Sequence, residues 1–227
     1  MANDLLGVSV TGLKVSQTAL RTVGHNIANA GTEGYSRQRI DPVTNPAVLM
    51  GRNYVGSGVN VNSVERIVNG FVTEQMRADS ALFNDLDTYF NQISQLDNLL
   101  SDESTGLGAG LNSFFSAMQN GADDPTSIPA RQLVISESEN LADRFNSIHD
   151  RLRVIGNGVE SGMEVAVSQI NVLAKNIAQL NLQIANATGA TNQQPNDLLD
   201  QRDLAIKELS SLVSVQVFDE GSGQVNV

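Results

Sequence analysis

The sequence of 227 residues predicts a mainly α-helical protein, an extended bundle of long helices with coiled-coil-like packing. Three observations predict this class. An apolar heptad repeat occupies the first thirty residues, a longer repeat runs between residues 141 and 184, and aromatic residues make up only 4% of the chain. The glycine and proline pattern adds an irregular extended arm near the N-terminus. A change of period near residue 213 adds the start of a β-rich domain at the C-terminus.

Residues 3–30 predict a helix whose apolar seam has coiled-coil spacing. The apolar members of this N-terminal seam are Leu6, Val10, Leu13, Leu20 and Ile27. Gln17 and Gly24 occupy two further seam positions, and several β-branched residues lower the helix propensity of the segment. Because so weak a helix does not persist alone in water, we expect residues 1–35 to be disordered in the isolated chain and to fold on assembly. The alternative is an ordinary amphipathic helix of a globular core.

Glycines and prolines at irregular spacing predict a linker or extended arm after this helix, over residues 31–61, with short β-like pieces such as 59–61. A second helix is predicted to begin at Asn62, with Glu65 completing a capping-box-like start. A short amphipathic helix follows near residues 107–118. The apolar face of the second helix comprises Ile67, Phe71, Ala78, Leu82, Leu86, Tyr89, Ile93, Leu96 and Leu100.

The longest predicted helix runs from Pro129 to Ala187 without an internal proline. About 59 residues at ~1.5 Å each form a rod of roughly 90 Å. The glycines at 156, 158 and 162 mark a place where the rod bends or breaks. We expect one face of the rod to pack on the 82–96 stretch of the antiparallel second helix. That face carries Ile170, Leu173, Ile177 and Leu180.

A final helix is predicted to begin at Asn196 as its capping residue. The period then changes to two over residues 213–218, which predicts a strand with no evident partner except in the arm. Because a lone strand is unstable, we expect it to be the entry to a further domain. The predicted segments are therefore an axial coiled-coil helix with a signature motif (1–35), an extended linker arm (36–61), a helical bundle (62–213) and an entry strand (214–227).

The residue types exclude several kinds of chemistry. Cysteine is absent, which excludes thiolate metal sites, disulfides and cysteine nucleophiles. Neither His25 nor His149 has a second histidine at ligand spacing, and no glycine-rich phosphate loop or Ser/His/Asp set occurs. We therefore expect no catalytic residue, no metal site and no cofactor.

The sharpest charged cluster consists of Asp200, Arg202 and Asp203. An acid/base role for these carboxylates has no supporting motif elsewhere in the chain. We therefore expect Arg202 to bridge carboxylates across the helix bundle.

The charge pattern excludes other partners. The net charge is −11, made up of +2 over residues 1–66 and −13 over the remainder. No basic stripe with stacking aromatics exists, so nucleic-acid binding is not expected. No run approaches the roughly 18 apolar residues of a membrane span, and the N-terminus lacks the pattern of a cleaved signal peptide.

The segment from Asn26 to Ala30, followed by Gly34 and Tyr35, resembles the N-terminal signature of flagellar axial proteins, which comprise rod, hook and hook-associated proteins. Residues 35–38 narrow the resemblance to the hook-associated proteins of the first hook–filament junction. Residues 196–203, and residues 113–115 with 129–131, resemble further runs of that family. Residues 30–34 depart from the usual Asn-Thr-Pro-Gly, and losing the proline makes this turn less rigid. The motif residues carried over are Asn26, Ile27, Asn29, Gly34, Tyr35, Ser36 and Arg37.

The resemblance implies a structural component of the bacterial flagellum that forms the hook–filament junction by head-to-tail helical assembly. It implies type III export without a cleaved signal peptide and an extracellular location. The implied partners are further copies in a helical ring or tube, the hook protein, a second junction protein, and an export chaperone that binds a C-terminal region outside this sequence. The N-terminal helix would pair with a C-terminal helix in the inner tube layer.

Three alternatives remain open on the sequence alone. A hook or rod protein shares the signature of residues 26–35, although the long helix and the 200–203 run favour the junction protein. A cytosolic coiled-coil adaptor would explain the heptads. An enzyme is the third alternative, and the missing site argues against it.

Overall fold

The computed structural model describes residues 2–102, 106–191, 193–221 and 223–227. The chain divides into two compact units, one formed by residues 1–82 with 170–227 and the other by residues 83–169. Five helices and six strands occur in the described part of the chain. The helical class and the long helix are as predicted.

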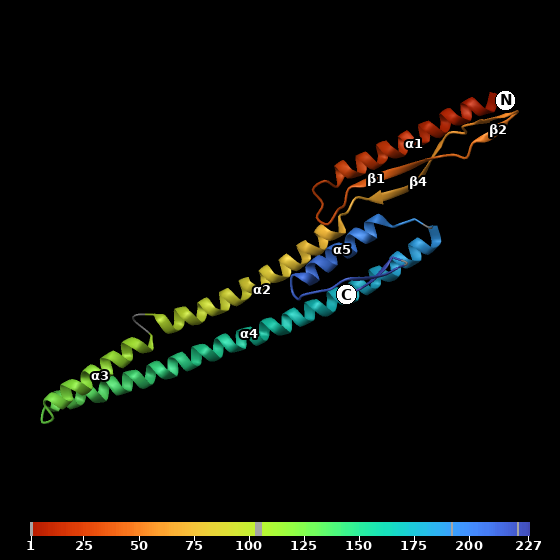
Figure 1. The fold of residues 1–227 in the computed structure, drawn as a ribbon. Coiled ribbons are helices and arrows are strands. Elements are labelled where there is room, and N and C mark those ends of the chain that lie inside the picture. Colours follow the sequence, from red (N-terminus) through yellow and green to blue (C-terminus); the bar gives the residue numbers. More distant parts are fainter. Residues whose placement is uncertain (1, 103–105, 192, 222) are drawn as a thin grey trace. The chain divides into compact units, whose positions relative to one another are not determined.

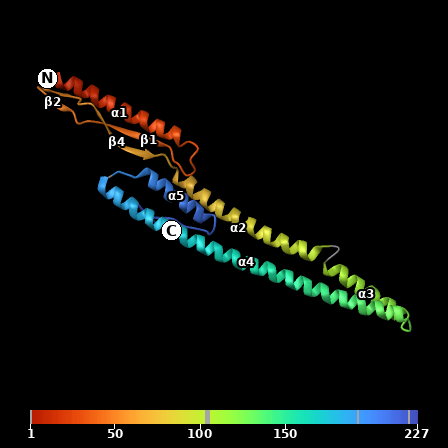
Figure 2. The ribbon, with the colours of Figure 1, turned by 180° about the vertical axis from the view of Figure 1, so that it is seen from behind.

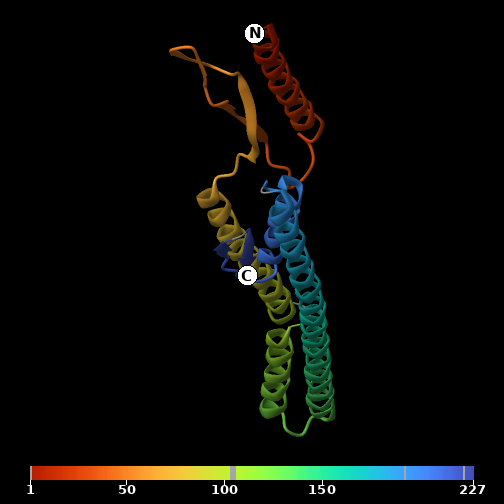
Figure 3. The same cartoon turned by 90° about the vertical axis from the view of Figure 1, so that its right-hand side faces the viewer.

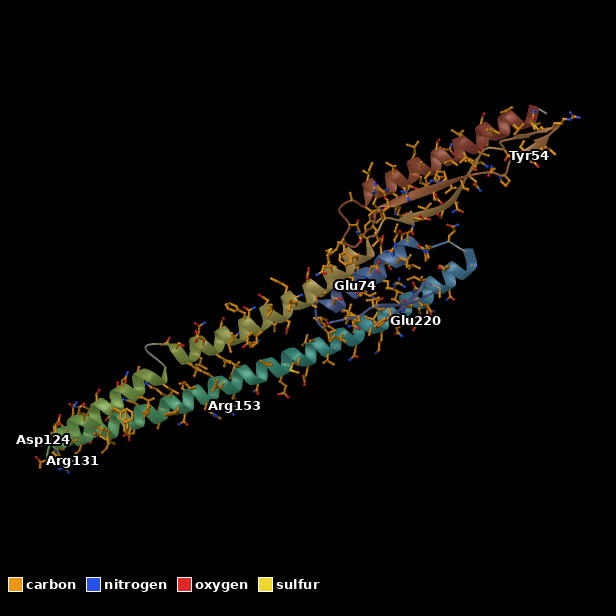
Figure 4. The ribbon with its side chains drawn as sticks, in the orientation of Figure 1. Tyr54, Glu74, Asp124, Arg131, Arg153 and Glu220 are labelled. Atoms are coloured by element: carbon orange, nitrogen blue, oxygen red, sulfur yellow. The ribbon has the colours of Figure 1, made fainter. Side chains whose placement is uncertain are left out.

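The first element is helix α1 (Ala2–Ala28), which forms where the heptad pattern predicts a helix. Strands β1 (Gln38–Thr44) and β4 (Val59–Arg66) pair antiparallel, with a register shift between Asp41 and Pro42. Strands β2 (Val48–Met50) and β3 (Asn53–Val55) form a separate ribbon, at which Tyr54 is labelled in Figure 4. We call residues 2–66 the N-terminal module. Its strands β1 and β4 lie along α1 (Figure 1).

The predicted disorder of residues 1–35 is wrong, because α1 is a continuous helix. The low helix propensity of the segment is offset by a packing partner inside the same chain, the strand pair that lies along one face of α1. Gly58 shows how close this packing is. Its φ of +100° suits glycine, and a Cβ there would overlap the hydroxyl of Thr11 on α1.

The helix predicted to begin at Asn62 starts later, at the first residue of α2 (Gly70–Ser101). The predicted β-like piece over residues 59–61 continues through residues 62–66 as β4. Glu65 accepts a hydrogen bond from Ser63 (2.9 Å) rather than closing a capping box. Asn69 is the capping residue of α2, since its side-chain oxygen accepts a hydrogen bond from the Val72 N–H (3.3 Å). The pairing of β4 with β1 therefore overrides a local capping signal.

The unit of residues 83–169 contains the second part of α2, helix α3 (Leu107–Asp123) and the first part of α4 (Ile128–Thr191). Helices α3 and α4 run side by side from the turn near Asp124 and Arg131 (Figures 3 and 4). At Gly110 a Cβ would come within 2.8 Å of the Arg144 side chain, so α3 approaches α4 closely there. Helix α4 is uninterrupted at the glycines at 156, 158 and 162, so the predicted break is absent.

The core of the other unit forms where α5 (Asn196–Ser210) lies beside the end of α4 (Figures 1 and 2). Its buried members are Ile177, Ala205, Ile206 and Leu209. Ile170 and Leu173 pack against this cluster, together with valines from residues 215–225. The 170–180 face of α4, which the sequence predicted to face residues 82–96, therefore packs against α5 and the final segment.

The end of the chain differs from the predicted unpaired strand over residues 213–218. Strands β5 (Phe218–Gly221) and β6 (Gln224–Asn226) pair antiparallel, so the strand begins later and has a partner. Val215 and Val217, which produced the period of two, pack on the core next to α5. The alternation over residues 213–218 therefore reflects the packing of Val215 and Val217 on the core, in an extended segment that is not paired as a strand.

Candidate assembly surface and the junction at Asp200

Helix α1 has two contrasting faces. At ~100° per residue, Thr11, Val15, Thr18, Thr22 and Asn26 share one face, and all are partly buried. Thr11 joins this face to the strands, since its hydroxyl accepts a hydrogen bond from the Val59 N–H (3.3 Å). The threonine hydroxyls donate to carbonyls one turn earlier in α1, as in Thr18 to Lys14 (3.0 Å), so this face packs without unsatisfied hydroxyls.

The N-terminal seam lies on the opposite face of α1. Its exposed fractions are 70% at Leu6, 43% at Val10, 59% at Leu13, and 72% at both Leu20 and Ile27. This row of exposed aliphatic side chains, interrupted at Gln17 and Gly24, is typical of an interface on a surface helix. Of the β-branched residues that weaken the helix in isolation, the threonines and Val15 lie on the covered face, whereas Val8, Val10 and Val23 are exposed, as are the heptad residues.

Asn26 joins α1 to the first strand. Its amide pairs with both backbone groups of Gln38, accepting from the N–H (2.8 Å) and donating to the carbonyl (2.9 Å). The same oxygen accepts from the hydroxyl of Tyr35 (2.7 Å). The Tyr35 ring meets the His25 ring edge-on at 5.4 Å. Burial, and secondarily the carboxylates of Asp197 and Asp200, raise the pKa of Tyr35 above 10.0, which keeps the phenol a donor.

The turn after α1 rests on α5. Gly34 has a φ of +78°, and a Cβ there would lie 3.1 Å from the side chain of Leu204, so both backbone conformation and space favour glycine. The next residues bring the backbone N–H of Ser36 to the carboxylate of Asp200 (3.0 Å). Part of the signature motif therefore forms a folded turn. This turn contacts the 196–203 run through Ser36 and Asp200, which are 164 residues apart in the sequence.

Asp200 and Asp203 are bridged by an arginine that the sequence analysis did not single out. Arg66 Nη1 contacts Asp200 Oδ1 (2.8 Å) and Asp203 Oδ2 (2.9 Å), and Arg77 Nη2 contacts Asp203 Oδ1 (3.5 Å). These side chains are largely shielded, with 8% exposure at Asp200 and 13% at each arginine. No local sequence signal links Arg66 to Asp200, because 134 residues separate them.

The described hydrogen bonds of Arg202 lead away from Asp200 and Asp203, and its bridging of carboxylates stays a prediction. Its guanidinium donates to Asn181 Oδ1 (3.1 Å) and to the carbonyl of Gly223 (2.6 Å). Asn181 also donates to the carbonyl of Val225 (2.8 Å). Because Arg202 is one helical step away from the Asp200–Asp203 face, it points to the C-terminal hairpin and contacts it at Gly223. Asn181 of α4 makes the contact to β6.

The other motif residues are placed apart from this junction. Ile27 belongs to the exposed seam, and Asn29 donates to the carbonyl of His25 (3.0 Å) within the end of α1. The Arg37 side chain is exposed, while its carbonyl accepts from the Ile67 N–H (2.8 Å). Asn196, predicted as a cap, is the first residue of α5 and donates to the carbonyl of Val64 (2.8 Å).

Comparison with known proteins decides the family. The family "Flagellar hook-associated protein FlgK helical domain" matches residues 93–227. The chain belongs to the flagellar hook-associated protein FlgK family. The hook-associated resemblance drawn from residues 26–38 and 196–203 is thereby confirmed, and the relatives carry this name rather than that of a hook or rod protein.

Curated FlgK relatives match nearly the whole chain. Flagellar hook-associated protein 1 of Salmonella typhimurium is 37% identical over 229 residues, and that of Escherichia coli is 35% identical; each match covers 99% of this chain. The protein of the same name from Bacillus subtilis is 31% identical over 98% of the chain. The chain spans 41% of the length of the first two relatives and 46% of the third.

The residues that the structure describes contain neither a candidate membrane span nor a candidate metal site. In the part of the chain that the structure describes, no helix is both long and apolar enough to cross a membrane. Among the same residues, no three histidine, aspartate or glutamate side chains come together as metal ligands.

Proposed function

We propose that this chain is part of a structural subunit of the bacterial flagellum that forms the hook–filament junction by head-to-tail packing of copies. The exposed N-terminal seam on α1 carries this proposal. A heterologous contact between a seam on one copy and a different surface on the next builds open helical assemblies or closed rings. The family of the chain supports the flagellar setting.

The proposed partners follow from that role. They are further copies of the same protein in a ring or tube, the hook protein on one side and a second junction protein on the other. We also propose a C-terminal helix as the occupant of the seam, and an export chaperone that binds a region outside this sequence. The protein would leave the cell through the type III channel without a cleaved signal and act outside it, without catalysis.

The proposal is tested by placing a charge in the seam. Leu13→Asp and Leu20→Asp, made in the full-length protein, should leave the body folded and abolish incorporation into flagella. A charge enclosed in an apolar seam without a partner costs several kcal/mol, on the order of 3–5 where it stays unpaired.

Leu182→Asp is the matched control, because Leu182 on α4 is 62% exposed, close to the value of Leu13. This variant should be incorporated normally. Normal motility and incorporation of both seam variants would show that the seam is not an assembly surface.

A further inference from the structure

The N-terminal module meets α5 through several polar contacts that differ sharply in exposure. Lys207 pairs with Glu33 (3.0 Å), but these side chains are 53% and 75% exposed. Asp197 accepts from Gln38 (3.3 Å) and is 71% exposed. Exposed contacts of this kind contribute little to holding two elements in one geometry.

Asp200 is the exception among these contacts. Its carboxylate is 8% exposed and accepts from the Ser36 N–H through one oxygen and from Arg66 through the other. Ser36 belongs to the turn after α1, and Arg66 is the last residue of β4. Because Gln38 pairs with Arg66 in the antiparallel register, one buried carboxylate on α5 contacts the chain on both strands at the same end of the β1–β4 pair.

The second shared group is the Arg66 guanidinium. The same nitrogen contacts Asp200 and Asp203, and Asp203 is in turn contacted by Arg77 of α2. Removing one partner from a shielded set of this kind leaves a buried charge without compensation, so the set favours one arrangement. Asn196 adds a neutral hydrogen bond to Val64 beside it.

We propose that Asp200, Arg66, Asp203 and Arg77 form a latch that fixes the direction in which the N-terminal module projects from α5. The assembly consequence rests on the proposed function: copies that pack through the N-terminal seam need it presented in one orientation. Asp200 is thus a positioning residue, which acts through Ser36 and Arg66 and not by contact with a neighbouring subunit.

The latch is tested by the distance between α1 and α5 in solution. Because the chain has no cysteine, Ser16→Cys and Gln201→Cys introduce one spin-label site on each helix, and both positions are exposed. Double electron–electron resonance on the parent should give a single narrow distance distribution. Asp200→Asn should broaden it at least twofold, with the helical circular dichroism retained.

Asp197→Asn is the matched control, since it makes the same chemical change one turn earlier on the same helix, at an exposed carboxylate facing the same turn. It should leave the distribution at the parent width. If Asp200→Asn does not fold, the double variant Asp200→Asn/Arg66→Gln removes both charges together and should fold with the same broadening. A parent-like width in whichever of these variants folds would overturn the latch.

The assembly consequence has a separate readout. In the full-length protein, Asp200→Asn should lower incorporation into flagella severalfold while Asp197→Asn does not. A broadened distribution with normal incorporation would overturn the assembly role. Failure of the seam variants Leu13→Asp and Leu20→Asp to affect incorporation would instead overturn the proposed function and leave the distance result standing.

Discussion

Helices α1 and α5 lie in the same unit and treat their apolar side chains in opposite ways. In α5, Leu199, Ala205, Ile206 and Leu209 are all at most 5% exposed. In α1, none of the side chains described over residues 6–28 is buried, and Leu20 and Ile27 are 72% exposed. Both helices are amphipathic. Contacts within the chain bury the apolar face of α5, but on α1 they cover only the threonine-rich face. Apolar periodicity therefore predicts which face of a helix is buried in an interface, but it does not predict whether the covering residues belong to the same chain.

The largest difference between the two helices should appear on truncation of one aliphatic side chain in each. Ile206→Ala should lower the free energy of unfolding by about 2–5 kcal/mol, because Ile206 is fully buried. Leu20→Ala should change it by less than about 0.5 kcal/mol in the isolated chain. Urea denaturation of both variants measures the contrast. Equal losses would mean that the seam is covered within the chain.

A second contrast uses glycines. Gly34→Ala should cost about 1–3 kcal/mol, since φ is +78° and Leu204 would have to move. Gly24→Ala, on the open face of α1 with no atom within reach of its Cβ, should stabilise α1 by about 0.5–1 kcal/mol. Thermal melts follow the first change and hydrogen exchange of the α1 amides follows the second. A melting temperature of Gly34→Ala at or above that of the parent, or faster exchange in Gly24→Ala, would contradict the two placements.

The smallest expected effect concerns pH. The pKa of Tyr35 is raised in the folded state, mainly by burial, so folding favours the protonated phenol. Its contribution to stability is complete below about pH 10, the ordinary value for tyrosine, and is lost as the pH rises through the raised folded pKa. Tyr35→Phe should therefore flatten the alkaline decline of the unfolding free energy. A decline as steep as that of the parent would show that Tyr35 does not couple to folding.

The sequence was sufficient for the features that depend on local periodicity. Heptad spacing predicted α1 and α4, and the exposed seam consists of the residues that the spacing singled out. The signature motif was recognised by resemblance, but its geometry was not, because Asn26, Ser36 and Asp200 meet through a turn and a helix far apart in the sequence.

The errors have a common physical origin in long-range pairing. Residues 62–65 carry a local helix-start signal, yet pairing with β1 makes them part of a strand. Asp200 and Asp203 were grouped with Arg202 as one charged cluster, yet both carboxylates pair with Arg66, while Arg202 donates to Asn181. Arg66 was counted only as a charge, since nothing near it in the sequence indicates an acidic partner.

The central claim is that the N-terminal seam is open in the free chain and covered in the assembly. Leu20→Cys in the full-length protein provides a single reactive thiol on the seam, and Leu182→Cys provides a comparably exposed control on α4. Maleimide labelling should modify both thiols in the free protein, and in purified flagella it should modify Leu182→Cys while leaving Leu20→Cys protected. Equal labelling of Leu20→Cys before and after assembly would contradict the account.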